Sequence, residues 1–159
     1  MSSLKQLALA LTVAALAFLA PTVPAVEAAG SVDPPVRESD YDKAVKDVKA
    51  EKYKDAIEKL QKVVQKEPGK ADAWNWLGYS QRKTGKYDDA LKSYTRALEI
   101  DAKHKGANEY LGELYLMTDN LPKAEGQLKV LIDLCPSGCS ERSDLEKAVA
   151  AYKKAKGLS

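Results

Sequence analysis

Histidine, cysteine and phenylalanine are scarce in this chain of 159 residues, which contains one, two and one of them, respectively. The one histidine, His104, falls in a predicted turn, and the sequence contains no Ser-His-Asp pattern beyond chance and no His/Cys cluster with the spacing of a zinc site. A glycine-rich phosphate loop is missing as well. Glu109 and Glu113 lie four residues apart, but such a pair on a helix is more often solvated or ligand-facing than catalytic. We therefore predict a protein that is not an enzyme and that uses no cofactor and no metal.

An excess of charge of one sign is also missing, because 25 Lys and Arg stand against 23 Asp and Glu, for a net charge of +2. A nucleic-acid-binding domain concentrates basic charge on one face. We therefore expect no nucleic-acid partner.

Long apolar runs are missing except at the N-terminus, where residues 7–20 are apolar apart from Thr12. A weakly basic lead precedes this run, two prolines follow it, and small residues surround Ala28. The layout is typical of a secretory signal peptide, and the run is shorter than the roughly 20 apolar residues of a membrane span. We predict a signal peptide over residues 1–28 and a periplasmic or secreted protein without membrane contact after cleavage. Residues 29–36, with two adjacent prolines, predict an extended leader.

From residue 37 onward, Pro and Gly are sparse and no stretch alternates as a strand would, so the predicted fold class is all-α. Residues 71–104 and 105–138 repeat each other with a period of 34, the signature of a helical solenoid. The matched residues are Leu77-Gly78 with Leu111-Gly112, Ala90 with Ala124, Tyr94 with Leu128, and Ala97-Leu98 with Leu131-Ile132.

These residues resemble the tetratricopeptide repeat family, whose pattern is a bulky residue, Leu-Gly, a Tyr, an Ala, an aromatic, an Ala and a Pro. Gln81 and Ala102 depart from this pattern in the second repeat. The resemblance implies a right-handed superhelix of seven helices, made of about three helix pairs and a C-terminal capping helix. Its segments are a degenerate first repeat at 37–70, a second at 71–104, a third at 105–138, and the capping helix and tail at 139–159.

Details of packing also follow from the repeat. Trp74, Leu77, Tyr87 and Tyr94 are assigned to helix packing. Gly85 and Asn120 are expected in tight turns with a left-handed conformation. The first repeat is interpreted as one residue short before Tyr53, and the capping helix begins at Ser140 or at Ser143, whose spacing to Glu146 fits a capping box.

In this family the first helix of each repeat lines a concave groove, so the resemblance implies a set of groove residues. Trp76 and Tyr110 occupy equivalent positions and are expected to be neighbours, although Trp76 alternatively packs into the core of the first repeat. Aromatic residues and Arg dominate interface energetics, which suggests a protein or peptide ligand. The predicted groove residues are Asn75, Trp76, Tyr79, Arg82, Lys83, Glu109, Tyr110, Glu113 and Met117, with Asp72 and Leu116 on the same face.

One subclass of the family grips the C-terminal carboxylates of chaperones with Lys and Asn at set groove positions. The residues at those positions here are Tyr41 and Val45 (or Asp42 and Lys46 after a one-residue shift), Trp76, Gly106 and Tyr110. The resemblance therefore does not imply that class of partner.

The only two cysteines are Cys135 and Cys139, around a Pro-Ser-Gly turn. Residues four apart across a helix end can come within disulfide reach, and exported proteins meet an oxidising environment. A bridge over so small a loop contributes about 2 kcal/mol and would fix the capping helix. The alternatives are a thiol-exchange pair or a Cu(I) site with His104 as third ligand.

The leading hypothesis is an exported bacterial scaffold that binds a peptide segment or partner protein in its groove and has no catalytic role. The alternative is a thiol-redox or copper-handling accessory that uses Cys135 and Cys139. A third hypothesis is self-association through the open edge of the first repeat.

Overall fold

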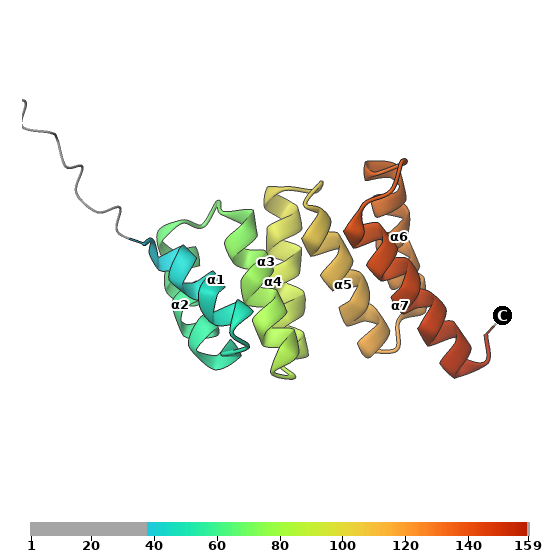
Figure 1. The fold of residues 1–159 in the computed structure, drawn as a ribbon, viewed down its shortest axis with the longest axis horizontal. Coiled ribbons are helices and arrows are strands. Elements are labelled where there is room, and N and C mark those ends of the chain that lie inside the picture. Colours follow the sequence, from blue (N-terminus) through green and yellow to red (C-terminus); the bar gives the residue numbers. More distant parts are fainter. Residues whose placement is uncertain (1–37, 159) are drawn as a thin grey trace, which may run out of the picture. The chain divides into compact units, whose positions relative to one another are not determined.

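The computed structural model describes residues 38–158, and these form seven α-helices and no strand (Figure 1). The predicted signal peptide, 1–28, and leader, 29–36, lie outside the described residues. None of the described helices is long and apolar enough to cross a membrane. The helices are α1 (Asp40–Lys49), α2 (Tyr53–Lys66), α3 (Ala71–Lys83), α4 (Tyr87–Ile100), α5 (Lys105–Met117), α6 (Leu121–Leu134) and α7 (Ser140–Lys156).

Three antiparallel pairs, α1/α2, α3/α4 and α5/α6, stack in chain order, and α7 covers the last pair. Figure 1 shows α1, α3, α5 and α7 side by side toward the viewer, with α2, α4 and α6 behind them. We call the layer of α1, α3, α5 and α7 the groove face. The predicted all-α repeat fold with seven helices is confirmed.

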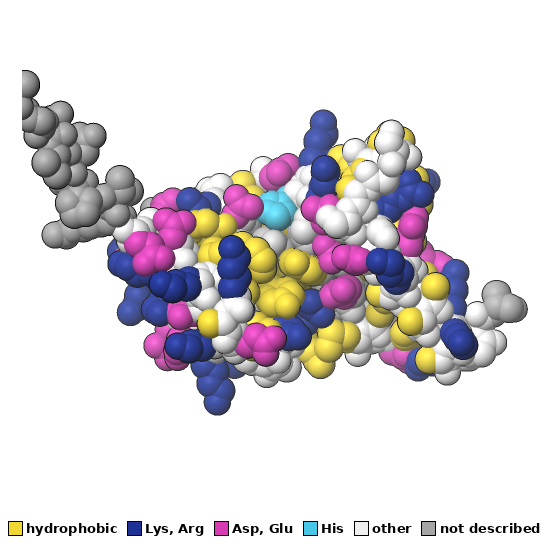
Figure 2. All heavy atoms as spheres, in the orientation of Figure 1, with side chains coloured by type: hydrophobic (Ala, Val, Ile, Leu, Met, Phe, Trp, Pro, Cys, Tyr) yellow, Lys and Arg dark blue, Asp and Glu magenta, His cyan; other side chains and the backbone are white. Residues whose placement is uncertain are grey.

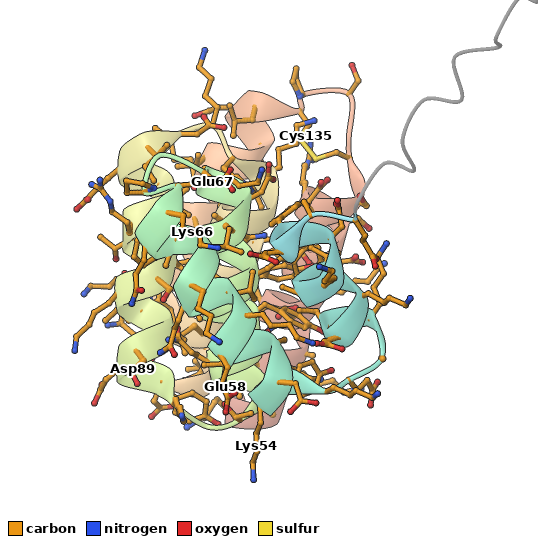
Figure 3. The ribbon with its side chains drawn as sticks, turned by 90° about the vertical axis from the view of Figure 1, so that its left-hand side faces the viewer. Lys54, Glu58, Lys66, Glu67, Asp89 and Cys135 are labelled. Atoms are coloured by element: carbon orange, nitrogen blue, oxygen red, sulfur yellow. A yellow bond between two sulfur atoms is a disulfide. The ribbon has the colours of Figure 1, made fainter. Side chains whose placement is uncertain are left out.

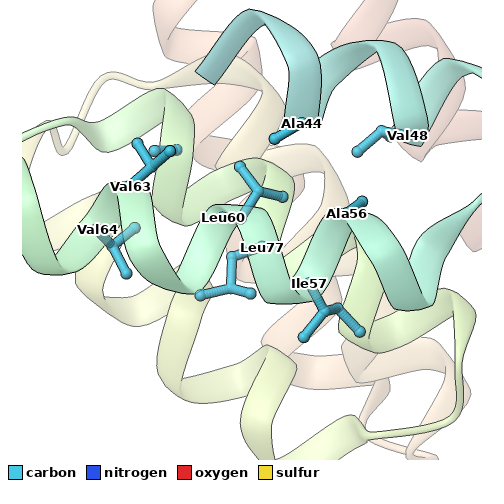
Figure 4. Close-up of a cluster of buried hydrophobic side chains, with 9 residues drawn as sticks. Ala44, Val48, Ala56, Ile57, Leu60, Val63, Val64 and Leu77 are labelled. Atoms are coloured by element: carbon cyan, nitrogen blue, oxygen red, sulfur yellow. The ribbon is translucent and has the colours of Figure 1, made fainter. Parts of the chain in front are cut away.

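The core runs through the stack as three clusters of buried side chains. The first lies between α1, α2 and α3, where Leu60 and Val63 are almost fully buried (Figure 4). The second surrounds Tyr94, and the third joins α6 to α7 around Leu131 and Leu145. Each cluster spans at least two helices, so every pair buries an apolar face that would otherwise meet water.

The first turn of each repeat contains one residue with a positive φ, at the same place in the 34-residue register. These residues are Glu51, Gly85 and Asp119, with φ values of 57°, 77° and 61°. The left-handed conformation expected for Gly85 is therefore confirmed, whereas that expected for Asn120 is wrong, because Asn120 has φ −117° and caps α6. The first repeat is also in register at this turn, so the expectation of a missing residue before Tyr53 is wrong.

One further packing expectation is wrong, and the start of the capping helix is decided between its two alternatives. Tyr94 and Leu77 are buried as expected, but Tyr87, the first residue of α4, is 36% exposed. The capping helix begins at Ser140 with Cys139 as its N-cap, so Ser143 lies inside the helix and forms no capping box. A capping box does occur at the start of α1, between Ser39 and Asp42.

Candidate functional site

An aromatic cluster occupies the middle of the groove face. Tyr79 lies at its centre, with its ring centroid 6.0 Å from Tyr53, 5.7 Å from Trp76 and 4.9 Å from Tyr110. The rings of Trp76 and Tyr110 are 6.4 Å apart, which confirms that these two residues are neighbours. Figure 2 shows the hydrophobic side chains gathered here, with acidic side chains beside them toward α5 and α7.

Trp76 has two roles in the structure. Its ring contacts Tyr79 and Tyr110, but it also packs against the core cluster of the first repeat. The half-buried ring therefore contacts both regions, as the groove interpretation and the core interpretation of Trp76 each predicted.

Arg82 lies in the floor of the groove face. Its guanidinium pairs with Glu113 at 2.7 Å, its Nε donates to the Tyr94 hydroxyl at 3.4 Å, and it stacks 5.3 Å above Tyr79. Only 10% of the Arg82 side chain is exposed. The sequence predicts that Arg82 and Glu113 contact a ligand in the groove. In the structure, these two residues form a salt bridge with each other.

Lys83, the next residue, is exposed and borders the aromatic cluster. Its ammonium lies 5.7 Å from the Tyr53 ring and 6.0 Å from the Tyr79 ring. Tyr53 was absent from the sequence-based set because it starts α2, a helix of the other layer. Tyr53 is the first residue after the turn between α1 and α2, and this position lies beside the C-terminal part of α3. That position in the repeat was the signal that could have identified Tyr53 from the sequence.

Asn75 and Glu109 occupy equivalent positions in the second and third repeats and are 4% and 7% exposed. Neither reaches freely into solvent, which differs from the exposed groove contacts that the sequence suggested. The Oδ1 atom of Asn75 is buried without a hydrogen-bond partner. Burial raises the pKa of Glu109 to about 8, and the carboxylates of Glu113, Asp144 and Glu141 add to that rise.

An open cavity of about 360 Å³ lies between α5 and α7, and we call it the α5–α7 groove. Met117 is its most accessible large apolar residue, at 49% exposed. The contribution of α7 was missed because that helix was interpreted only as a lid. Ala148 and Tyr152, four residues apart on α7, were the signal in the sequence that marked this face. The groove is lined by Arg82, Glu113, Leu116, Met117, Ala148 and Tyr152.

His104 caps the N-terminus of α5. Its Nδ1 accepts a hydrogen bond from the Ala107 amide at 3.0 Å, and its Nε2 lies 3.1 Å from an Asp72 carboxylate oxygen. Both ring nitrogens are therefore engaged, which removes the third ligand of the copper alternative. Within residues 38–158 no group of three or more His, Cys, Asp or Glu side chains is arranged to hold a metal ion.

Cys135 and Cys139 are paired in the structure, with Cα atoms 5.9 Å apart (Figure 3). Cys135 ends α6 and Cys139 begins α7, so the pair joins the third repeat to the capping helix. Arg142 adds a second tie, because its Nη1 donates to the carbonyls of Cys135 and Pro136, each at 3.3 Å. The start of α7 is thus held by two separate interactions.

The family model of the tetratricopeptide repeat matches residues 41–105 and 78–138. No curated protein matches the chain. Three similar solved structures, all under 25% identical, show the likeness of the fold. They are the Yersinia enterocolitica type III secretion chaperone SycD in complex with a peptide of the translocator YopD (24% identity, 73% of this chain and 88% of that chain, TM-score 0.63), PcrH in complex with the chaperone binding region of PopD (20%, 74% and 89%, 0.64) and MamA (22%, 79% and 71%, 0.67).

Proposed function

The chain belongs to the tetratricopeptide repeat family, and we propose that it is a non-catalytic scaffold that binds a peptide segment of a partner protein on its groove face. The observation that carries this proposal is the α5–α7 groove, an open cavity that adjoins the aromatic cluster. SycD and PcrH, which share the fold, have been solved in complex with segments of other proteins. A fold of this kind supplies surface rather than reactive groups.

The predicted groove residues divide into two sets under this proposal. Trp76, Tyr79, Lys83, Tyr110 and Met117 supply contact surface, because each is partly or fully exposed. The remaining four lie deeper and form the floor of the face. The floor residues are Asn75, Arg82, Glu109 and Glu113.

Capture of a partner protein by two matched variants tests the proposal. Met117→Glu places a charge in the α5–α7 groove, and Ile132→Glu places the same charge at a 39% exposed apolar site on α6. We expect wild type and Ile132→Glu to capture the same partner in cross-linking mass spectrometry, and Met117→Glu to lose it with an unchanged circular dichroism melt. Equal capture by Met117→Glu would place the partner on another surface.

We also propose that the protein is exported, that residues 1–28 are removed, and that Cys135 and Cys139 form a structural disulfide. The N-terminal layout of the sequence supports export, and paired cysteines persist in oxidising compartments. Protein recovered from the periplasm or medium should begin at Ala29 and weigh two hydrogen atoms less than its reduced form. A retained N-terminal segment contradicts cleavage.

Thiol exchange by the cysteine pair is the second candidate function. One observation favours it: Cys139 is the N-cap of α7, and a helix N-terminus favours a thiolate. Against it, Cys135 is only 7% exposed, which shields its sulfur from an incoming thiol. Resistance of the folded protein to millimolar glutathione would exclude this candidate and leave the structural bridge.

A further inference from the structure

The α5–α7 groove has two chemically different halves. On α5, Glu113, Leu116 and Met117 line the cavity, and Glu109 lies one helical turn before Glu113, beyond the lining. On α7, Ala148 and Tyr152 line the cavity, and Glu141 and Asp144 precede them along the helix, close enough to Glu109 for their carboxylates to raise its pKa. We call the cavity's Glu113 end, together with these three neighbouring acids, the acidic half. Because both helices run in the same direction, their acidic ends meet at one end of the groove and their apolar ends at the other (Figure 1).

Among the carboxyls of the acidic half, those of Glu109 and Glu141 have no cation within residues 38–158. Glu141 accepts a hydrogen bond from the Ser140 hydroxyl at 3.0 Å, which leaves Glu109 without any partner. Arg82 of α3 is bound to Glu113 at 2.7 Å, and Asp144 is bound to Lys147 at 3.0 Å. No hydrogen bond or ion pair within residues 38–158 reaches the side chain of Glu109. The charged groups that act on it are Arg82 from α3, Glu113 from α5, and Asp144 and Glu141 from α7, three acids against one base.

Burial makes this unpaired carboxyl a strong binding determinant. Glu109 is 7% exposed, and a carboxylate withdrawn from water without a partner is costly. Burial therefore raises the pKa of Glu109 to about 8, and the free protein holds a proton there at neutral pH.

A second unpaired acceptor lies next to the same turn of α5. The Oδ1 atom of Asn75 is buried without a partner, and the Asn75 side chain faces Gly106, where an added Cβ would lie 3.3 Å from its Nδ2. Gly106 precedes Glu109 by three residues and so lies one helical turn away on the same side of α5. Two buried acceptors of this kind fit a ligand that brings N–H donors and positive charge.

We propose that the acidic half of the α5–α7 groove binds the ammonium or guanidinium group of a Lys or Arg in the partner peptide, and that the apolar half binds a large apolar side chain close to it in the peptide. This inference rests on the proposed peptide-binding function and specifies its ligand. The incoming cation replaces the proton of Glu109, which leaves as a free proton, so the charge of the acidic half is balanced before and after binding.

Selection of peptides from a randomised dodecapeptide library tests the proposal on the full chain. Wild type should select peptides in which Lys or Arg lies within four residues of a large apolar residue. Glu109→Gln, which keeps the shape of the side chain, should select peptides without enrichment of basic residues. Glu58→Gln is the matched control, because Glu58 is an exposed residue of α2 (Figure 3).

The outcomes separate this inference from the function on which it rests. Wild-type peptides without basic enrichment, or the same enrichment with Glu109→Gln, overturn the cation site and leave peptide binding intact. Failure of wild type to select any peptide counts against both.

Calorimetry of one selected peptide supplies a second readout that a merely structural role would not change. Its heat of binding at pH 7, compared between two buffers of different ionisation enthalpy, should show release of about 0.9 proton, since a group with pKa about 8 is mostly protonated there. Affinity should rise about tenfold per pH unit from 6 to 8 and level off above 8. Proton release that is unchanged in Glu109→Gln, or in the same peptide with its Lys replaced by norleucine, refutes the site.

Discussion

The second and third repeats share one register but fill equivalent positions with different contacts. Beside Gly78 of the second repeat lies the ring of Tyr94, from the partner helix of the same pair. Beside Gly112 of the third lies Leu145, from the capping helix. An identical Leu-Gly motif therefore supports packing within a pair in one repeat and packing between units in the other.

The turns that end these two repeats differ in the same way. Residues 101–104 close through hydrogen bonds of Asp101 and His104, and His104 then caps α5. At the equivalent place in the third repeat, Cys135 and Cys139 are paired instead. The third repeat is followed by a single helix, α7, whose N-cap Cys139 makes no side-chain capping hydrogen bond and is paired with Cys135 instead.

Replacement of Arg82 should cause the largest difference in unfolding free energy between equivalent positions of the second and third repeats. Arg82→Met leaves Glu113 without its partner in a largely enclosed site, so we expect a loss of about 3 kcal/mol in the free energy of unfolding. Leu116→Met, at the equivalent position of the third repeat, should cost less than about 1.5 kcal/mol. Urea denaturation at pH 7 measures both, and equal losses would show that the Arg82–Glu113 pair is not structural.

The contribution of Glu109 to the free energy of unfolding should depend on pH, whereas Asn75, at the equivalent position of the second repeat, has no side chain that titrates. The folded-state pKa of Glu109, about 8, lies above its unfolded value near 4.5, so the folded state binds more protons and its stability falls as pH rises between these values. Glu109→Gln should match wild type at pH 4 and be more stable by on the order of 2 kcal/mol at pH 8.5, after allowance for solvent screening. An unchanged difference across this range would contradict the raised pKa.

Removal of the cysteine pair and removal of the His104 cap should lower the free energy of unfolding by different amounts. Cys135→Ser with Cys139→Ser should lower the free energy of unfolding by about 2 kcal/mol on the chain-entropy model. His104→Ala should lower it by about 1 kcal/mol, because it removes only the cap of α5. Urea denaturation without reductant gives both values, and a larger loss for His104→Ala would reverse the ranking of the two turns.

Substitution of Gly78 and Gly112 by Ala should have the smallest effects on the free energy of unfolding. A Cβ at Gly78 would lie 2.7 Å from the fully buried Tyr94 ring, and one at Gly112 would lie 2.5 Å from a terminal methyl of Leu145. A rigid ring moves less readily than a leucine end, so Gly78→Ala should cost about 1 kcal/mol after the gain in helix propensity, and Gly112→Ala close to zero. Thermal melts of the two variants provide the test; a larger shift at Gly112 would mean that Leu145 is the more constrained side chain.

Sequence reasoning was most accurate where the controlling interactions are local. The helix pairs, the left-handed Gly85 and the burial of Tyr94 all follow from a pattern that repeats every 34 residues. It failed for Asn120, which was assigned by its residue type, and for Tyr87, because the register does not tell how far a side chain at the start of a helix is exposed. For the groove, sequence identified the face but not how deeply each side chain lies, as Arg82 shows.

By itself, the sequence determined a stack of helix pairs with a fixed period, because helix periodicity, small residues at close approaches and turn positions are properties of neighbouring residues. Only the tertiary structure decided that Arg82 forms a salt bridge with Glu113 and that Glu109 is buried without a cation. Those facts depend on α7, whose carboxylates at positions 141 and 144 come from more than 30 residues farther along the chain. Burial and pairing are sums over all the elements that meet at one place, and no single segment contains that information.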